Sequence, residues 1–255
     1  MSTSFTQRLL VSAAFAGIAA AGCRDTSSDV LVSAASSLRV ALEEIAQTYV
    51  HNGGDHVVLN SGASSSLARQ IVEGAPVDLF ISADEVQMAT AERAGKVIRG
   101  TRVDLLSNQL AIIAPSDSQL VVKDVTDLTA PDIRRIGMGN PAAVPVGVYT
   151  RDLLTKRALW ERVQPKVIPF EAAEVALAAA EAGHVDVAFV YITDAQRSSR
   201  VRTLLVIPRE QAPPIVYPAA IVPAGGHEQG ARRFLDYLRG TEAKAVFTRH
   251  GFIVL

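Results

Sequence analysis

Short apolar runs alternate with stretches of helical periodicity along almost the whole chain after residue 29. Strand-like runs occupy residues 30–33, 57–59 and 78–82, and each is followed by a segment in which apolar side chains recur every three or four residues. This order is typical of βαβ units, in which helices connect parallel strands and cover the sheet. The alternation therefore restricts the chain to the α/β class.

The same alternation continues to the end of the chain. Further strands are expected at 110–114, 136–138, 167–169, 187–191 and 215–222, and helices at 151–160, 173–182, 230–238 and 242–249. We predict two lobes, each a mostly parallel sheet flanked by helices, joined by two crossing strands near 109–114 and 217–222. Two lobes joined in this way close like a hinge around a ligand. A single doubly wound domain is the alternative, although single cores seldom grow beyond about 250 residues.

The first 22 residues have the pattern of a secretory signal. Arg8 is their only charged residue, and an apolar run at 9–21 ends in small residues and is too short to span a bilayer comfortably. The segment 20–23, Ala-Ala-Gly-Cys, resembles the bacterial lipobox, which implies lipidation of Cys23, the only cysteine. A plain signal peptide with an incidental cysteine is the alternative. We expect an exported protein of the periplasm or cell envelope, anchored to a membrane through lipid alone.

These features divide the chain into four parts. Residues 1–22 are the expected lipoprotein signal peptide, and residues 23–29 are the tether. Residues 30–109 and 221–255 form lobe I, residues 110–220 form lobe II, and a ligand cleft lies between the lobes. Only 20% of the residues are charged and the formal net charge is −1, without a basic block. This balance argues against a nucleic-acid partner.

Serines follow the first two predicted strands and precede the helices that come next. Ser36 and Ser37 lie before one helix, and Ser64, Ser65 and Ser66 lie before the other. The carboxyl edge of an α/β sheet is where ligands bind, and the free N–H groups of a helix start attract anions. Serine is also a favoured N-cap, so a purely structural role is the alternative for each site.

Six blocks resemble the signature segments of the periplasmic molybdate-binding proteins, the substrate-binding components of molybdate ABC importers. They are VSAASSL at 32–38, GASSSLARQ at 62–70, GAPVDLFISAD at 74–84, GNPAAVPVGVY at 139–149, FVYITDA at 189–195 and FTRHGFI at 247–253. The resemblance implies a type II periplasmic binding protein fold and a monomer without a cofactor. It also implies high-affinity binding of molybdate or tungstate and its delivery to the permease and ATPase of an importer.

The same resemblance implies which residues hold the oxyanion. Ser37 and Ser64 would donate from their hydroxyl and backbone N–H groups, Val146 and Ala173 from backbone N–H groups, and Tyr191 from its phenol. No side chain would coordinate the metal directly. The family commonly has Ala at the position of Val146 and Val at that of Ala173. A two-residue gap in the alignment would move the role of Ala173 to Val175.

Other functions find less support in the residues. A serine-dependent hydrolase is disfavoured because residues 62–66 lack the second glycine of a nucleophile elbow and no histidine occurs in a catalytic motif. The sequence also has no cluster of His, Cys, Asp or Glu at the spacing of metal ligands, no phosphate-binding loop and no dinucleotide-binding fingerprint. We therefore expect a binding protein rather than an enzyme. Sulfate, phosphate or chromate on the same fold is the closer alternative, since these oxyanions share shape and donors with molybdate.

Overall fold

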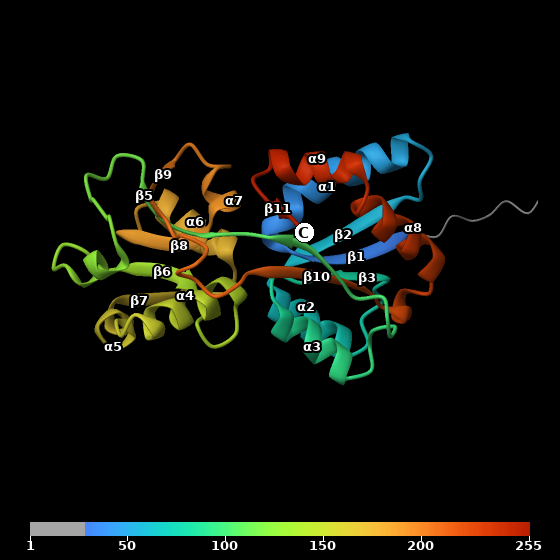
Figure 1. Cartoon of the computed structure of the whole chain (residues 1–255), viewed down its shortest axis with the longest axis horizontal. Helices are drawn as coiled ribbons and strands as arrows, with labels where there is room; N and C mark the ends of the chain where they lie inside the picture. The colour runs from blue at the N-terminus through green and yellow to red at the C-terminus, as the bar shows by residue number, and fades with distance from the viewer. Residues whose placement is uncertain (1–28) are drawn as a thin grey trace, which may run out of the picture.

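The computed structural model describes residues 29–255, which form two α/β lobes lying side by side (Figure 1). The predicted signal peptide, Cys23 and all of the tether but Asp29 lie outside the described residues. Within residues 29–255, no helix is both long and apolar enough to cross a membrane.

Lobe I is built on a six-stranded sheet with the strand order β11-β4-β10-β3-β1-β2. The strands are β1 (Val30–Ala35), β2 (Val57–Gly62), β3 (Leu79–Ile81), β4 (Val103–Ser107), β10 (Val216–Ile221) and β11 (Ile253–Val254). Helices α1 (Arg39–His51), α8 (Glu228–Leu238) and α9 (Thr241–Arg249) lie on one face, and α2 (Ser64–Val72) and α3 (Glu85–Arg93) lie on the other (Figure 1). Both faces of the sheet are therefore buried.

Lobe II is built on a five-stranded sheet with the order β7-β6-β8-β5-β9. Its strands are β5 (Leu110–Pro115), β6 (Ile136–Gly139), β7 (Val167–Phe170), β8 (Val187–Tyr191) and β9 (Val201–Val206). Its helices are α4 (Pro145–Lys156), α5 (Trp160–Val163), α6 (Ala173–Glu181) and α7 (Ile192–Ala195). Four short 3₁₀ helices complete the fold: η1 (Ser36–Leu38), η2 (Val125–Thr129), η3 (Gln164–Lys166) and η4 (Pro223–Gly225).

Both sheets are mixed, whereas mostly parallel sheets were expected. In lobe I, β1 runs parallel to β2 and β3, but β10 runs antiparallel to both β3 and β4. In lobe II, β6 runs parallel to β7 and β8, but β5 runs antiparallel to β8 and β9. Every antiparallel pair includes β4, β5 or β10, which are strands next to the two chain crossings. Parallel neighbours need a crossover connection, usually a helix, and a chain that passes directly into the other lobe has no such connection at that point.

The chain crosses between the lobes twice, between β4 and β5 and between β9 and β10 (Figure 1). Residues 216–220 were expected in lobe II, but β10 pairs along its length with β3 and β4 of lobe I. The second crossing therefore lies at residues 207–215. A boundary at 220/221 would divide a strand that is hydrogen-bonded as one unit.

Strand register brings the two serine segments together. β1 and β2 pair from Val30 opposite Val57 to Ala35 opposite Gly62, so both strands end at the same level. η1 begins directly after Ala35 and α2 begins two residues after Gly62. Because parallel strands present their carboxyl ends at one edge of the sheet, the starts of η1 and α2 lie side by side.

Candidate functional site

A small cavity lies where the carboxyl edges of the two sheets face each other. Its volume is about 20 Å³, far below the several hundred cubic ångströms that are typical of sites for organic ligands. Lobe I contributes Ala35, Ser36, Ser37, Gly62, Ala63, Ser64 and Ala83, and lobe II contributes Val144, Pro145, Val146, Ala173 and Tyr191. The cavity therefore brings together all five residues expected to bind an oxyanion.

The serines in the cavity do not act as helix caps. The N-cap residue of α1 is Leu38 and that of α2 is Ala63, and neither helix start has a side-chain cap hydrogen bond. Ser37 lies within η1, and Ser64 is the first residue of α2. The purely structural role that capping would have given these hydroxyls is therefore not what the structure shows.

Both serine hydroxyls are buried and accept or share a hydrogen bond inside lobe I. The Ala83 backbone N–H donates to Ser64 Oγ over 2.9 Å. Ser37 Oγ lies 3.1 Å from the Tyr217 hydroxyl oxygen. Ser64 therefore has its own O–H left over for a ligand, because a hydroxyl donates one proton while accepting elsewhere.

Tyr191 carries a buried hydroxyl with no partner among the described residues. The side chain ends β8 and is 2% exposed, and its phenol oxygen has no hydrogen-bond partner. Burial raises the pKa of Tyr191 well above its ordinary value, so the phenol keeps its proton at neutral pH. A buried donor left unpaired costs about 1–3 kcal/mol, which a ligand in the cavity would recover.

The two backbone donors expected from lobe II lie at helix starts. Val146 is the second residue of α4, after Pro145, and Ala173 is the first residue of α6. The N–H groups of a first helical turn have no partner within the helix. Ala173 lines the cavity and Val175 does not, so the ungapped alignment agrees with the geometry.

The cavity wall contains no charged side chain, since its residues are Ala, Ser, Gly, Val, Pro and Tyr. Helices α2, α4 and α6 all begin at this wall, and each helix start carries about half a positive charge. The site therefore offers an anion convergent neutral donors and helix dipoles. Nearby, burial raises the pKa of the Asp84 carboxyl to about 6.

Contacts across the cleft hold the two lobes together at this cavity. The Tyr149 hydroxyl of α4 donates to the Ala83 carbonyl oxygen of lobe I over 3.5 Å, and both groups are buried. Helix α6 of lobe II also packs against η1 of lobe I. In the described conformation the two lobes therefore touch at the cavity, and residues of both line it.

The arrangement offers no nucleophile activated by a base. None of the five histidines, all of which fall within residues 29–255, lines the cavity. The groups that contact Ser37 and Ser64 are a phenol and a backbone N–H, neither of which removes a proton at neutral pH. Across the same residues, no group of three or more His, Cys, Asp or Glu side chains could hold a metal ion.

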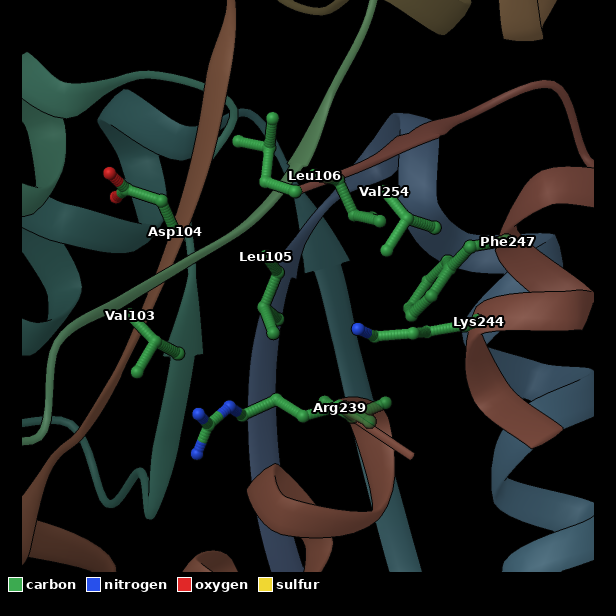
Figure 2. Close-up of a pocket in the computed structure, with 10 residues that line it drawn as sticks. Val103, Asp104, Leu105, Leu106, Arg239, Lys244, Phe247 and Val254 are labelled. Carbon is green, nitrogen blue, oxygen red and sulfur yellow. The ribbon is translucent and has the colours of Figure 1, made fainter. Parts of the chain in front are cut away.

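A larger cavity of about 330 Å³ lies elsewhere in lobe I, between β4, β11 and α9. Figure 2 shows Arg239 and Lys244 beside Leu105, Phe247 and Val254 at this pocket. None of the residues expected to bind an oxyanion lines it. Its wall comes from lobe I alone and includes the side chains of Asp104, Arg239 and Lys244. The smaller cavity, which is lined by both lobes, is therefore the candidate site.

The remaining lining residues were not assigned to the oxyanion site from the sequence, although Ser36 was noted beside Ser37 before a helix. They are Ala35, Ser36, Gly62, Ala63, Ala83, Val144 and Pro145. Most are small residues that let backbone approach the cavity closely. All of them lie within the blocks at 32–38, 62–70, 74–84 and 139–149 that resemble the family's signature segments. Their place in these blocks is the feature of the sequence that could have identified them as lining residues.

Known proteins resemble the chain over nearly its whole described length. The model of the bacterial extracellular solute-binding protein family matches residues 30–253. The molybdate-binding protein ModA of Escherichia coli (strain K12) is 36% identical over 231 residues, which cover 88% of this chain and 89% of that protein. The putative ABC transporter substrate-binding lipoprotein YvgL of Bacillus subtilis (strain 168) is 32% identical over 96% of each chain.

A solved structure shares the two-lobed fold. The periplasmic molybdate-binding protein of Azotobacter vinelandii aligns with a TM-score of 0.79 and 24% sequence identity, covering 89% of this chain and 99% of that one. At this level of identity the likeness concerns the fold alone.

Proposed function

The chain belongs to the bacterial extracellular solute-binding protein family, and from this membership we propose that it binds molybdate outside the cytoplasm. Tungstate, which is nearly the same size, is the second ligand. The bound ion would be delivered to the permease and ATPase of an ABC importer. The molybdate-binding relative, which is 36% identical over 88% of the chain, supports this ligand most directly.

The unpaired Tyr191 hydroxyl is the observation that carries the proposal. It faces a cavity whose wall also holds the Ser37 and Ser64 hydroxyls and the starts of α4 and α6. A tetrahedral dianion has four equivalent oxygens and needs donors converging from all sides. Hydrogen bonds to a charged group are worth about 1.5–3 kcal/mol each. Six of them would exceed the cost of association by enough for micromolar to nanomolar affinity.

Neutral donors also suit a carrier that must release its cargo. An arginine in the cavity would pair tightly with the anion and slow its transfer. The family consists of solute-binding proteins, and the absence of a base beside Ser37 or Ser64 supports a role in binding rather than catalysis. The hydroxyls of these serines would hold the ion, and neither would attack a substrate.

Calorimetry on protein lacking residues 1–23 tests the ligand. Titration with molybdate and tungstate should give one site per chain with sub-micromolar affinity, and sulfate should bind much more weakly because its shorter bonds leave the donors out of reach. Tighter binding of sulfate than of molybdate would transfer the proposal to sulfate. No response to any of the three ions would refute an oxyanion carrier.

We also propose that Cys23 is lipidated and anchors the protein to a membrane, with release of residues 1–22. The lipobox-like segment at 20–23 supports this, as does the lipoprotein relative that is 32% identical. Two or three acyl chains hold a protein firmly on a membrane, whereas one chain does not. Mass spectrometry of the exported protein should find acyl groups on an N-terminal Cys23. Gel filtration should show a monomer.

A further inference from the structure

Asp84 places a buried carboxyl group directly beside the cavity between the lobes. It follows Ala83, which lines the cavity and accepts a hydrogen bond from Tyr149 across the cleft. Asp84 is 4% exposed, and its Oδ1 accepts the Gln87 backbone N–H over 2.7 Å at the start of α3. An N-cap needs only an acceptor, and Ser, Thr or Asn would supply one without a charge. The protein therefore has an ionisable group where a neutral cap would be enough.

No cation offsets the charge of Asp84 in the part of the chain that the structure describes. The neighbouring ionisable side chain, Glu85, is another carboxylate, and Arg102 donates to Glu85 over 2.8 Å rather than to Asp84. Lobe II brings the phenols of Tyr149 and Tyr191 within reach of this charge. Burial, followed by nearby charges that include Asp84, raises the pKa of both phenols, so they stay neutral.

The elements that pack against α3 add no partner for the carboxylate. Helix α3 contacts α2 and β10, whose only ionisable side chains are Arg69 and Tyr217. Arg69 is exposed to solvent and forms no ion pair with Asp84. Tyr217 is buried, and burial raises its pKa, so it stays neutral. Asp84 is thus surrounded by neutral groups and one like charge.

A dianion in the cavity would act on this carboxylate through space. The Cα atoms of Ala83 and Asp84 are about 3.8 Å apart, which puts the carboxylate on the order of 10 Å from an ion beside Ala83. With an effective dielectric constant of about 20, repulsion at that distance corresponds to on the order of a 100-fold loss of affinity. Protonation of Asp84 would remove this repulsion, and burial already raises the pKa of its carboxyl to about 6.

We propose that Asp84 takes up one proton from solvent when the oxyanion binds, so that the protein holds the anion together with a proton. Binding then adds one negative charge to the protein instead of two. When the anion leaves, the carboxyl loses the proton again. This inference rests on the proposed function and adds a second ligand, the proton, to the same site.

Asp194 is the other buried carboxyl group beside the cavity. It is 0% exposed and accepts the Tyr191 backbone N–H, and burial raises the pKa of its carboxyl to about 6 as well. Arg197, however, donates to Asp194 over 2.7 Å, and this cation offsets part of the field of an added anion. Asp84 has no such cation, so its charge is the one that a bound dianion destabilises most.

Calorimetric titration with molybdate measures the proton directly. Binding enthalpies recorded at pH 7 in two buffers that differ in ionisation enthalpy, and that contain no oxyanion, give the number of protons taken up. The wild-type protein should take up more than half a proton per molybdate. Its dissociation constant should rise about 30- to 100-fold from pH 6 to pH 8.5. Molybdate keeps both charges throughout this range, so its own titration does not contribute. A dissociation constant independent of pH, without proton uptake, would overturn the inference.

Asp84→Asn removes the ionisable group while keeping an oxygen that can cap α3. This variant should take up no proton and should bind molybdate with the same affinity from pH 6 to pH 8.5. At pH 8.5 it should bind about 30- to 100-fold more tightly than the wild type. Uptake that persists in the variant would show that another group takes the proton. If Asp84→Asn does not fold, Asp84→Ser gives the same test, because serine also caps helices.

Asp124→Asn is the matched control. Asp124 also caps a helix start, that of η2 in lobe II, but Arg157 pairs with it and it does not line the cavity. This variant should keep the proton uptake and the pH dependence of the wild type, and their loss here would contradict a specific role of Asp84. The wild-type protein separates the two claims. If it binds no oxyanion, the proposed function fails; if it binds molybdate without taking up a proton, only the role of Asp84 fails.

Discussion

The Tyr149 hydroxyl and the Ala83 carbonyl oxygen meet across the cleft at a distance of 3.5 Å. One belongs to a helix of lobe II and the other follows β3 of lobe I. Ala83 also donates its N–H to Ser64 Oγ. Ala83 therefore contacts both Tyr149 of lobe II and the Ser64 hydroxyl that would bind the ligand. The contact between the lobes and the position of this hydroxyl are structurally linked through one residue.

Tyr149→Phe should favour the open form. Loss of one hydrogen bond between the lobes is worth about 0.5–1.5 kcal/mol, so we expect molybdate affinity to fall about 3- to 10-fold. Small-angle X-ray scattering should show a larger radius of gyration for the ligand-free variant than for the wild type. An unchanged affinity together with an unchanged radius would show that this contact does not stabilise closure.

Tyr191→Phe should have opposite effects on binding and on stability. The lost donor weakens molybdate binding by about 10- to 100-fold, as expected for a hydrogen bond to an anion. The ligand-free protein should melt at a higher temperature, because the buried hydroxyl has no partner among the described residues. Calorimetry and thermal denaturation measure the two effects. A lower melting temperature would mean that the hydroxyl is already satisfied without ligand.

Gly147→Ala should disrupt lobe II. A Cβ at this position would lie 1.9 Å from the Gly139 carbonyl oxygen, a backbone atom that cannot move aside easily. Overpacking of this severity costs about 3 kcal/mol or more, and it would displace the start of α4 from the cavity. Denaturant unfolding should show the loss. Gly183→Ala is the control, because Gly183 has a φ of 69° but open space around it, and only about 1 kcal/mol of strain is expected.

Asp84→Asn should raise stability at pH 7 and flatten its dependence on pH. Burial raises the folded-state pKa of Asp84 to about 6, above its ordinary value of 3.8. The folded protein therefore holds a proton more tightly than the unfolded chain, and stability falls as pH rises from about 4 to 6. Removing the ionisable group should therefore raise the free energy of unfolding by about 2–3 kcal/mol above that pH window. The amide oxygen of the asparagine can still cap α3 by accepting from the Gln87 backbone N–H, as the carboxylate does.

Asp124→Asn is the control, because the contribution of the Asp124 carboxyl to stability should depend on pH with the opposite sign. A backbone hydrogen bond from Thr126 lowers the pKa of Asp124, so its contribution is present at neutral pH and is lost as pH falls through the folded-state pKa. Urea unfolding measures both variants, between about pH 4 and pH 8 for Asp84→Asn and from about pH 5 down to about pH 2 for Asp124→Asn. The same pH profile for Asp84→Asn and the wild type would show that Asp84 does not titrate in this window.

The α/β class and the residues that line the cavity at the sheet edges could be predicted because both depend on local order along the chain. Apolar periodicity indicated the central strands, and the position of Ser37 and Ser64 between strand and helix indicated an anion site. The strands β4, β9 and β11 were not predicted. In β9 only the first residue is buried, and β11 has two residues, so neither has the apolar pattern that identifies a strand.

The partners of the site could not be predicted, because they depend on contacts between distant parts of the chain. Ser37 and Tyr217 are 180 residues apart in sequence, and Asn108, whose side-chain amide donates to the Tyr217 hydroxyl, is 109 residues from it. The sequence also left open whether the serines cap their helices. Only the backbone geometry showed that Leu38 and Ala63 occupy the cap positions.

The position of β10 in the middle of the lobe I sheet constrains the order in which the protein can fold. β10 lies between β3 and β4, yet it is separated from both in sequence by the whole of lobe II. A chain that emerges from its N-terminus can assemble β5 to β9 from one continuous segment, but the first lobe must wait for its last 40 residues. Until they arrive, the edges of β3 and β4 stay unpaired and open to wrong partners. Lobe II is thus the part that can form first, and the binding site is finished last.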